Sequence, residues 1–327
     1  MTTRSKIVGT GSFVPEQVLT NRDLESMIDT SDEWITTRTG IKQRHIARPG
    51  ENNSDLAVEA SRAALSMAGI EPAELDLIIV GTLTGDMPMP SVACLVQDRL
   101  GAGHAGAFDV SATCSGFLYS LSIADKFIKD NPSMKILAIG SEVLSRRTNW
   151  NDRTTCVIFA DGAGAAVVTG SDDEGGILST CLHADGSVWE LLTIRGLGTA
   201  HPIDQDIISK GWHYIEMKGR DVFKHAVKAL ESVAHEAMER AGWTNEDLDL
   251  LIAHQANIRI LDFLRERLHL PKEKVFINID KYGNTSAASI PIALDEANRS
   301  GRLKKGDNIL MISFGGGFTW AGVTMRW

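Results

Sequence analysis

The residue in this sequence with the clearest potential for chemistry is Cys114. It follows a strand-like run that begins at Ala107 and comes just before an apolar-periodic helix, so it lies at a strand-turn-helix corner. Free backbone N–H groups and the positive end of a helix dipole favour the thiolate, which is the reactive form of cysteine. Small neighbours such as Ser115 and Gly116 leave room for a substrate. A cysteine is more often a buried core residue, but this setting favours a nucleophile for acyl transfer from thioesters.

A nucleophilic cysteine needs partners that supply a proton or hydrogen bonds. His254 follows the strand-like run that ends at Ile252, and Asn284 lies in a turn between a strand predicted over residues 275–279 and a helix of small residues. A glycine triplet, residues 315–317, follows another predicted strand. Its backbone N–H groups suit an oxyanion hole, although a glycine triplet alone is more often a tight turn.

The elements around these residues indicate a layered α/β protein. Helical patterns alternate with short apolar runs, and the run Leu77–Val80 is apolar throughout, as in strands that are buried on both faces. Two predicted helices, residues 56–69 and 226–242, each end in Ala-Gly and lead into such a run.

The spacing of these elements indicates an internal duplication. The two Ala-Gly helix ends, the Leu-Asp-Leu strand starts at Leu75 and Leu248, and the Ile-Leu pairs at Ile136 and Ile309 are all separated by the same distance along the chain. Chance similarity between α/β units is the alternative, and the constant offset weakens it. A polar, glycine-bearing stretch at residues 171–176 divides the chain into halves 1–172 and 173–327, so that Cys114 belongs to the first half and His254 and Asn284 to the second.

The composition narrows the class of protein. A net charge of -9 gives no overall attraction for nucleic acid, so a phosphate-bearing partner needs a local basic patch. The apolar runs fall far short of the roughly 18 to 20 residues that span a bilayer, and we expect a cytoplasmic protein with no membrane partner. The four cysteines have no CxxC spacing, which disfavours a zinc site. The GxGxxG letters at residues 101–106 follow a helix and precede a strand, the reverse of a dinucleotide-binding site.

Taken together, these motifs resemble the β-ketoacyl-acyl-carrier-protein synthase III family of the thiolase superfamily. The likeness covers nearly the whole chain and includes residues 30–41, the Cys114 corner, and residues 159–166, 254–257, 283–288 and 314–320. The resemblance implies a duplicated, five-layered αβαβα thiolase fold, a homodimer, and a Cys-His-Asn active site with no metal and no cofactor beyond the coenzyme A thioester substrate.

The resemblance also implies a reaction, the first condensation of type II fatty-acid synthesis. Cys114 would take an acyl group from acyl-CoA, most simply acetyl-CoA, with the backbone N–H groups of Cys114 and Gly316 holding the oxyanion. His254 and Asn284 would then stabilise the enolate formed when malonyl-acyl-carrier protein loses carbon dioxide. The enolate attacks the acyl group to give a 3-ketoacyl product.

Two binding surfaces follow from the same resemblance. The coenzyme A contacts would be the stacking pair Trp34 and Arg153, together with Arg38, Thr30 and Asn257. Without the resemblance, Trp34 is equally well a core aromatic. The contacts with the acyl carrier protein would be Lys224, Arg259, Arg265 and Arg267. A solvated charged helix face is the alternative, and Glu266 interrupts the basic run.

Two departures from the family bear on the substrate. Met89 stands where the family commonly has phenylalanine at the floor of the acyl pocket of the partner subunit, and methionine is flexible enough to admit a longer or branched acyl group. The loop 195–211 is longer than expected. A related condensing enzyme for longer acyl groups and a non-catalytic acyl-CoA-binding scaffold are the alternatives. A degradative thiolase needs a second cysteine near the C-terminus, and none follows Cys181.

Overall fold

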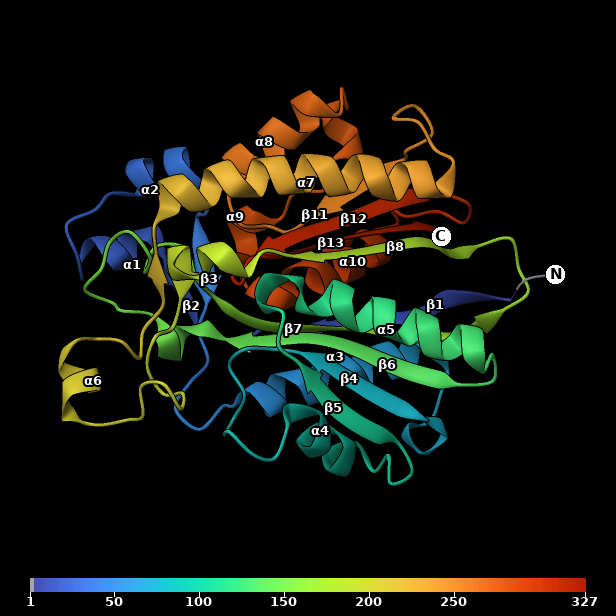
Figure 1. Ribbon diagram of the computed structural model, residues 1–327, viewed down its shortest axis with the longest axis horizontal. Coiled ribbons are helices and arrows are strands. Elements are labelled where there is room, and N and C mark those ends of the chain that lie inside the picture. The colour runs from blue at the N-terminus through green and yellow to red at the C-terminus, as the bar shows by residue number, and fades with distance from the viewer. Residues whose placement is uncertain (1–2) are drawn as a thin grey trace.

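The computed structural model describes residues 3–327, and its core is two β-sheets with helices between and outside them (Figure 1). The first sheet has the strand order β1-β7-β6-β4-β5, and the second has the order β11-β12-β13-β8. The strands of the first sheet are β1 (Arg4–Phe13), β7 (Asp161–Ser171), β6 (Lys135–Val143), β4 (Leu77–Gly81) and β5 (Gly106–Val110). Those of the second are β11 (Leu250–Ala253), β12 (Asn308–Gly315), β13 (Thr319–Arg326) and β8 (Gly176–Ala184).

The helices form three layers around these sheets. The central layer is α5 (Gly116–Asp130) and α10 (Ser289–Arg299), the outer layer on the first sheet is α3 (Asn53–Ala68) and α4 (Val92–Leu100), and the outer layer on the second sheet is α7 (Gly219–Ala241) and α8 (Ile258–Arg267). Leu121 and Leu294 of the central layer share one core with Ile79 of the first sheet and Ile252 of the second. The predicted five-layered αβαβα arrangement is confirmed.

The two halves repeat the same order of elements. In each sheet a parallel pair is followed by antiparallel strands on one side, as the pairs β4·β6 and β11·β12 and the pairs β6·β7 and β12·β13 show. The 3₁₀ turns η2 (Thr113–Ser115) and η6 (Ser286–Ala288), which precede α5 and α10, are separated by the same offset as the paired helices and strands. Thr113 and Ser286 also share a positive φ, 45° and 50°. The offset seen in the sequence therefore reaches the backbone of the turns.

The prediction of a strand over residues 275–279 is wrong. Val275 makes an isolated parallel bridge to Leu251, and Ile279 already begins the short helix α9 (Ile279–Tyr282). The Gln255 side chain accepts a hydrogen bond from the Asn278 backbone N–H (3.0 Å) and donates to the Phe276 carbonyl (3.1 Å). These side-chain bonds take the place of strand pairing beyond Val275.

Two helices begin earlier than the sequence predicted. The helix expected from residue 56 starts at Asn53, because the Asp55 carboxylate accepts a hydrogen bond of 2.7 Å from the Asn52 backbone N–H and so stabilises the first turn. The helix expected from residue 226 starts at Gly219. The extra turns of α7 bring Arg220 and Lys224 to the edge of the cavity described below.

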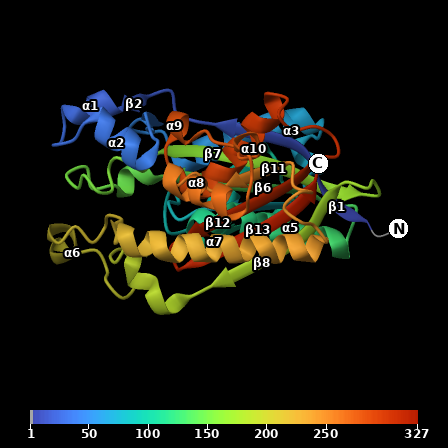
Figure 2. The same cartoon turned by 90° about the horizontal axis from the view of Figure 1, so that it is seen from above.

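Smaller elements project at one end of the molecule, opposite the two termini (Figure 2). They are β2 (Val18–Thr20), α1 (Asn21–Glu25), α2 (Asp32–Thr39), β3 (Gln43–His45), β9 (Leu192–Thr193), α6 (Gln205–Ser209) and β10 (Glu216–Met217). The segment predicted as a loop, residues 195–211, contains α6, and the β9–β10 pair closes its base.

The chain passes from the first sheet to the second at residues 172–175, between β7 and β8. The division of the chain at residue 172 stays a prediction. Among residues 3–327, no helix combines the length and the apolar character needed to cross a membrane.

Candidate active site

One cavity of about 690 Å³ contains the three residues to which the sequence assigned the chemistry. Cys114, His254 and Asn284 line it together with Trp34, Arg38 and Asn257. Most of the remaining lining is apolar, including Phe159, Leu192, Val222, Phe223, Ile260 and Phe314. The cavity therefore joins a reactive cysteine to a route long enough for an extended ligand.

The Cys114 turn packs tightly against the end of β12. A Cβ atom added to Gly315 would lie 2.3 Å from the Thr113 hydroxyl and 2.6 Å from the Cys114 backbone nitrogen. The Thr113 hydroxyl donates a hydrogen bond to the Gly316 carbonyl at 2.9 Å. Glycine at position 315 is therefore required for the contact between Cys114 and the end of β12.

Burial of the Cys114 thiol opposes the effect of the helix dipole, which the sequence analysis expected to favour the thiolate. The pKa of the Cys114 thiol is raised to about 12, mainly by burial and to a smaller extent by the nearby Glu142 carboxylate, while the Ser286 hydroxyl lowers it. The dipole of α5 does not offset the loss of hydration. Removal of the Cys114 proton is therefore a necessary part of any nucleophilic step.

His254 is a neutral imidazole. Its side chain is buried just beyond β11, and its backbone N–H donates to the Ile312 carbonyl at 2.9 Å. Burial lowers the pKa of His254 to about 4. At neutral pH the ring therefore carries one N–H donor and no charge.

Asn284 is held by its backbone on both sides. Its N–H donates to the Ile158 carbonyl (3.0 Å), and its carbonyl accepts from the Ala160 N–H (2.9 Å). The side-chain oxygen of Asn284 accepts from the Ser286 N–H at 2.8 Å. This bond orients the amide, so that its NH₂ group is left as a donor for a ligand.

Most of the residues predicted to bind coenzyme A lie together. The Arg153 guanidinium stands 4.5 Å from the centre of the Trp34 ring, and that of Arg38 stands 5.6 Å from it. The Asn257 side chain caps α8 by accepting from the Arg259 N–H at 2.9 Å. Thr30 is not among the residues that line the cavity, and its hydroxyl is buried with no partner in the described part of the chain.

The predicted basic patch is divided. Lys224 and Arg259 line the cavity, as does Arg220, which the sequence analysis missed because it placed the start of α7 too late. Arg265 and Arg267 lie further along α8 and face acidic side chains. Arg265 approaches Asp262 and Glu266 at 3.9 and 3.4 Å, and Arg267 approaches Glu231 at 3.7 Å.

Met89 lies outside this cavity. Its side chain is 84% exposed, in the segment between β4 and α4. Within one chain it therefore does not line the space around Cys114.

Two further residues near Cys114 were missed. Ser286 lies in η6, which packs against the Cys114 turn, and its hydroxyl lowers the pKa of the thiol, while Glu142, at the end of β6, is fully buried. The signal for Ser286 was its position in the second half, which is equivalent to that of Thr113 in the first. The signal for Glu142 was a charged residue in an otherwise apolar strand.

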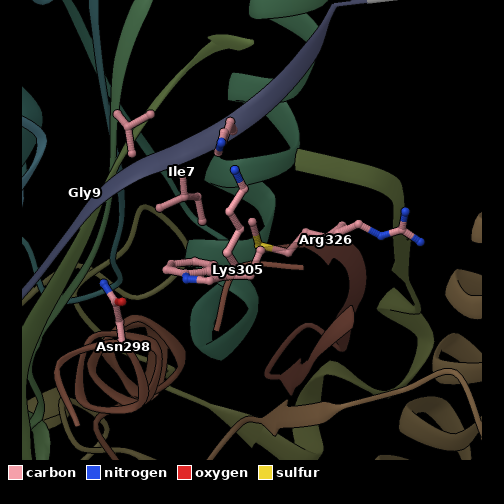
Figure 3. Close-up of a pocket in the computed structure, with 9 residues that line it drawn as sticks. Ile7, Gly9, Asn298, Lys305 and Arg326 are labelled. Atoms are coloured by element: carbon pink, nitrogen blue, oxygen red, sulfur yellow. The ribbon is translucent and has the colours of Figure 1, made fainter. Parts of the chain in front are cut away.

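A second pocket, of about 380 Å³, lies where β1 meets the C-terminal strand and is lined by Lys6, Asn298, Lys305 and Arg326 among others (Figure 3). Lys6 is paired with Asp173 at 2.6 Å, and Arg326 donates to Asn308 at 3.2 Å. None of the candidate residues lies there. Across residues 3–327, no three His, Cys, Asp or Glu side chains gather as a metal ion would need.

Comparison with known proteins agrees with this geometry. The family model described as 3-oxoacyl-[acyl-carrier-protein (ACP)] synthase III matches residues 108–186, and the model of its C terminal part matches residues 238–327. The beta-ketoacyl-[acyl-carrier-protein] synthase III of Caldanaerobacter subterraneus subsp. tengcongensis is 54% identical over 98% of this chain and 97% of its own length. That of Aquifex aeolicus is 53% identical over 99% of each.

Solved structures give the same result. The crystal structure of 3-oxoacyl-[acyl-carrier-protein] synthase III from Aquifex aeolicus matches with a TM-score of 0.91 and covers 99% of this chain and 100% of its own. The Thermus thermophilus structure matches with a TM-score of 0.91 at 44% identity, over 98% of each chain.

Proposed function

Because the chain belongs to the β-ketoacyl-[acyl-carrier-protein] synthase III family, it is a condensing acyltransferase that initiates fatty-acid synthesis, and we propose that Cys114, His254 and Asn284 are its catalytic residues. The observation that carries this proposal is the shared cavity, which is lined by a cysteine and two neutral hydrogen-bond donors. The predicted family, fold class and reaction are confirmed.

The first half-reaction transfers an acyl group from acyl-CoA to Cys114. The sulfur attacks the thioester carbonyl, and the coenzyme A thiolate leaves. We assign the oxyanion hole to the backbone N–H groups of Cys114 and Gly316, because Gly315, the residue before Gly316, packs closely against the Cys114 backbone nitrogen.

The second half-reaction uses the two donors. Malonyl-acyl-carrier protein loses carbon dioxide, and negative charge develops on its thioester oxygen. His254 and the Asn284 amide donate hydrogen bonds to that oxygen, and the enolate attacks the acyl-Cys114 carbonyl. A neutral imidazole suits this role because it remains a donor without needing a counter-ion in a buried site. The thioester substrates carry the reactive groups, so the proposal needs no metal or further cofactor.

Coenzyme A would enter between α2 and α8. Arg153 and Trp34 are stacked at the entrance, which suits an adenine ring, while Arg38 and Asn257 line the way inward and suit its phosphates and pantetheine amides. Thr30 lies on the segment before α2, and its buried hydroxyl, which has no partner among residues 3–327, would be a further contact for coenzyme A.

The acyl carrier protein would dock at the mouth of the same cavity. Lys224 and Arg259 are the strongest candidates of the predicted patch, because they line the cavity, and Arg220 joins them. Arg265 and Arg267 would contribute at the margin, because they do not line the cavity.

A homodimer fits the exposed edge of the first sheet. β5 is the last strand of that sheet, and in residues 3–327 no strand pairs with its outer side. Met89 is exposed in the segment that leads into α4, beside β5, and could reach into the acyl pocket of a second subunit. We propose acetyl-CoA as the primer. The flexible Met89 is the one observation that favours a longer or branched acyl-CoA instead.

One assay tests the whole proposal. The protein is incubated with radiolabelled acyl-CoAs of increasing length, and malonyl-acyl-carrier protein is then added while carbon dioxide release and product length are followed. We expect label on Cys114 and a 3-ketoacyl product, with acetyl-CoA as the preferred donor. A protein that takes label from no acyl-CoA would overturn the proposal.

A further inference from the structure

The Ser286 side chain connects the Cys114 thiol to a buried carboxylate. It lies in η6, which packs against the Cys114 turn η2, and its hydroxyl lowers the pKa of the Cys114 thiol and donates to the Glu142 carboxylate at 3.1 Å. Its backbone N–H donates to the Asn284 side-chain oxygen, and this bond fixes the turn that carries the hydroxyl. One side chain therefore lies between the nucleophile and an acceptor of protons.

Glu142 is a charged group without a cation. Its side chain is fully buried, and in the described part of the chain no Lys, Arg or His forms an ion pair with it. The carboxylate instead accepts from Ser286, Thr82 (3.3 Å), the Leu83 N–H (3.2 Å) and the Thr84 hydroxyl. Burial outweighs these donors and raises the pKa of Glu142 to about 7, so its charge is easily lost at neutral pH.

The hydrogen-bond directions depend on where the proton lies. While Glu142 is ionised, the Ser286 hydroxyl donates to it and can only accept from Cys114, which keeps the thiol protonated. Once Glu142 is protonated, it donates to Ser286, and Ser286 can donate to a Cys114 thiolate. The ionisation of the thiol and that of the carboxyl are therefore coupled through one hydroxyl.

We propose that Ser286 and Glu142 form a proton relay that accepts the Cys114 proton during acyl transfer. This inference rests on the proposed function of Cys114 as the nucleophile. Ser286 is the member of the relay that lies on the turn packed against Cys114, and Glu142 is a positioning residue that acts through it.

The relay returns to its starting protonation state after one turnover. In acyl transfer the Cys114 S–H bond breaks, its proton goes to the Ser286 oxygen, and the Ser286 proton goes to Glu142. The sulfur electron pair forms the bond to the acyl carbon, and coenzyme A leaves as a thiolate that takes a proton from water. When the enolate later displaces Cys114, the sulfur leaves as a thiolate and recovers the proton from Glu142 along the same path.

A protonated Glu142 also suits the second half-reaction. During condensation an enolate forms close to Cys114, and a negative charge behind the thioester would oppose it. At that stage Glu142 holds the proton from Cys114 and is therefore neutral.

The other ionisable groups around Glu142 have separate partners or roles. Asp161 on β7 accepts from Ser145, and Asp86 beyond β4 accepts from Ser54. His254 lies at the cavity and stays neutral. Cys114 is thus the group whose titration is expected to couple to Glu142.

The test measures acyl-enzyme formation by rapid quench between pH 5 and pH 9. In the unchanged protein we expect the acylation rate to rise with an apparent pKa near that of Glu142. The variant E142Q keeps the shape and accepts most of the same hydrogen bonds but takes up no proton, so it should acylate about 100-fold more slowly at pH 8 and lose the pH-dependent rise. E142D should recover the rise and part of the rate. Decarboxylation by pre-acylated E142Q should stay within about threefold of the unchanged protein.

A second variant keeps the test decisive if E142Q folds poorly. S286G removes the hydroxyl and accommodates the positive φ of 50°, and it should show the same slow, pH-independent acylation. The control S120A removes another buried hydroxyl near the turn, one bonded to the Gly116 carbonyl at 2.9 Å, and should acylate within about threefold of the unchanged protein.

The outcomes separate the relay from the proposed function. If E142Q and S286G acylate at the normal rate with the normal pH profile, the relay is wrong while Cys114 remains the nucleophile. If both half-reactions fall equally, or if E142D recovers neither the rise nor the rate, Glu142 has only a structural role. If the unchanged protein forms no acyl-Cys114, the proposed function itself fails.

Discussion

The Asn284 side-chain oxygen accepts a 2.8 Å hydrogen bond from the Ser286 backbone N–H. The variant N284D keeps an oxygen for this bond but replaces the NH₂ donor with a second oxygen. We expect malonyl decarboxylation to fall about 100- to 1,000-fold, because one donor to the developing enolate is lost. Acylation of Cys114 should fall less than tenfold. Rapid-quench measurement of each half-reaction checks this, and equal losses in the two would contradict the assigned role.

Replacement of the nucleophile has a simple expected result. C114S should form no acyl-enzyme with acetyl-CoA, because a serine hydroxyl at this position has an even higher pKa than the buried thiol. Mass spectrometry of the intact protein gives the adduct directly, and circular dichroism shows whether the fold is retained. An acyl adduct on folded C114S would mean that another residue is the nucleophile.

The close approach of β12 to the nucleophile gives a steric prediction. A Cβ at position 315 would lie 2.6 Å from the Cys114 nitrogen, whereas a Cβ at Gly186 would meet nothing within 4 Å. G315A should therefore displace the Cys114 turn and lower the acylation rate at least tenfold, while G186A should acylate within about twofold of the unchanged protein. Single-turnover acylation of both variants checks this. Normal acylation by G315A would show that the contact does not position Cys114.

The sequence predicted the architecture well because the architecture is repeated. The constant offset between the two halves identified the paired helices and strands, and periodicity identified which faces are buried. The prediction failed at residues 275–279, where the Gln255 side chain replaces strand pairing. Such a side-chain substitute for a ladder depends on contacts between distant segments, and no local pattern in the sequence shows it.

The candidate site was predicted less completely. The turns that carry Cys114 and Asn284 were recognisable from small residues at strand ends, and the cavity unites both with His254. The charge state of Cys114 could not be predicted, because burial outweighs the helix dipole, and burial is a property of the folded molecule. Glu142 was missed for the same reason, since its surroundings come from separate segments of the chain.

The stacked entrance gives a prediction about binding. Trp34 contacts the Arg153 guanidinium at 4.5 Å, and W34A should raise the KM for acetyl-CoA about tenfold with kcat within about twofold, because a stacking surface worth about 1–3 kcal/mol is lost. The matched control is W189A, which removes a tryptophan paired with Arg195 at 5.6 Å outside the cavity lining. Its KM should stay within about twofold. Steady-state kinetics of both variants check this. An equal rise of KM in the two variants would argue against Trp34 as part of the coenzyme A entrance.

The buried Glu142 carboxyl also predicts a pH dependence of stability. Its pKa is about 7 in the folded protein, above the ordinary value of 4.5, so between these pH values the folded state holds a proton that the unfolded state has released. The free energy of unfolding therefore falls as pH rises through this range, by about 3 kcal/mol for a shift of this size. The free energy of unfolding of E142Q does not fall in this way, because glutamine has no ionisable group. The difference in unfolding free energy between E142Q and the unchanged protein, measured in urea, should shift by about 3 kcal/mol in favour of E142Q from pH 4.5 to pH 8. The opposite slope from His254, whose pKa is lowered to about 4, is present in both proteins and cancels in the difference. A difference that is constant with pH would show that Glu142 ionises equally in the folded and unfolded states.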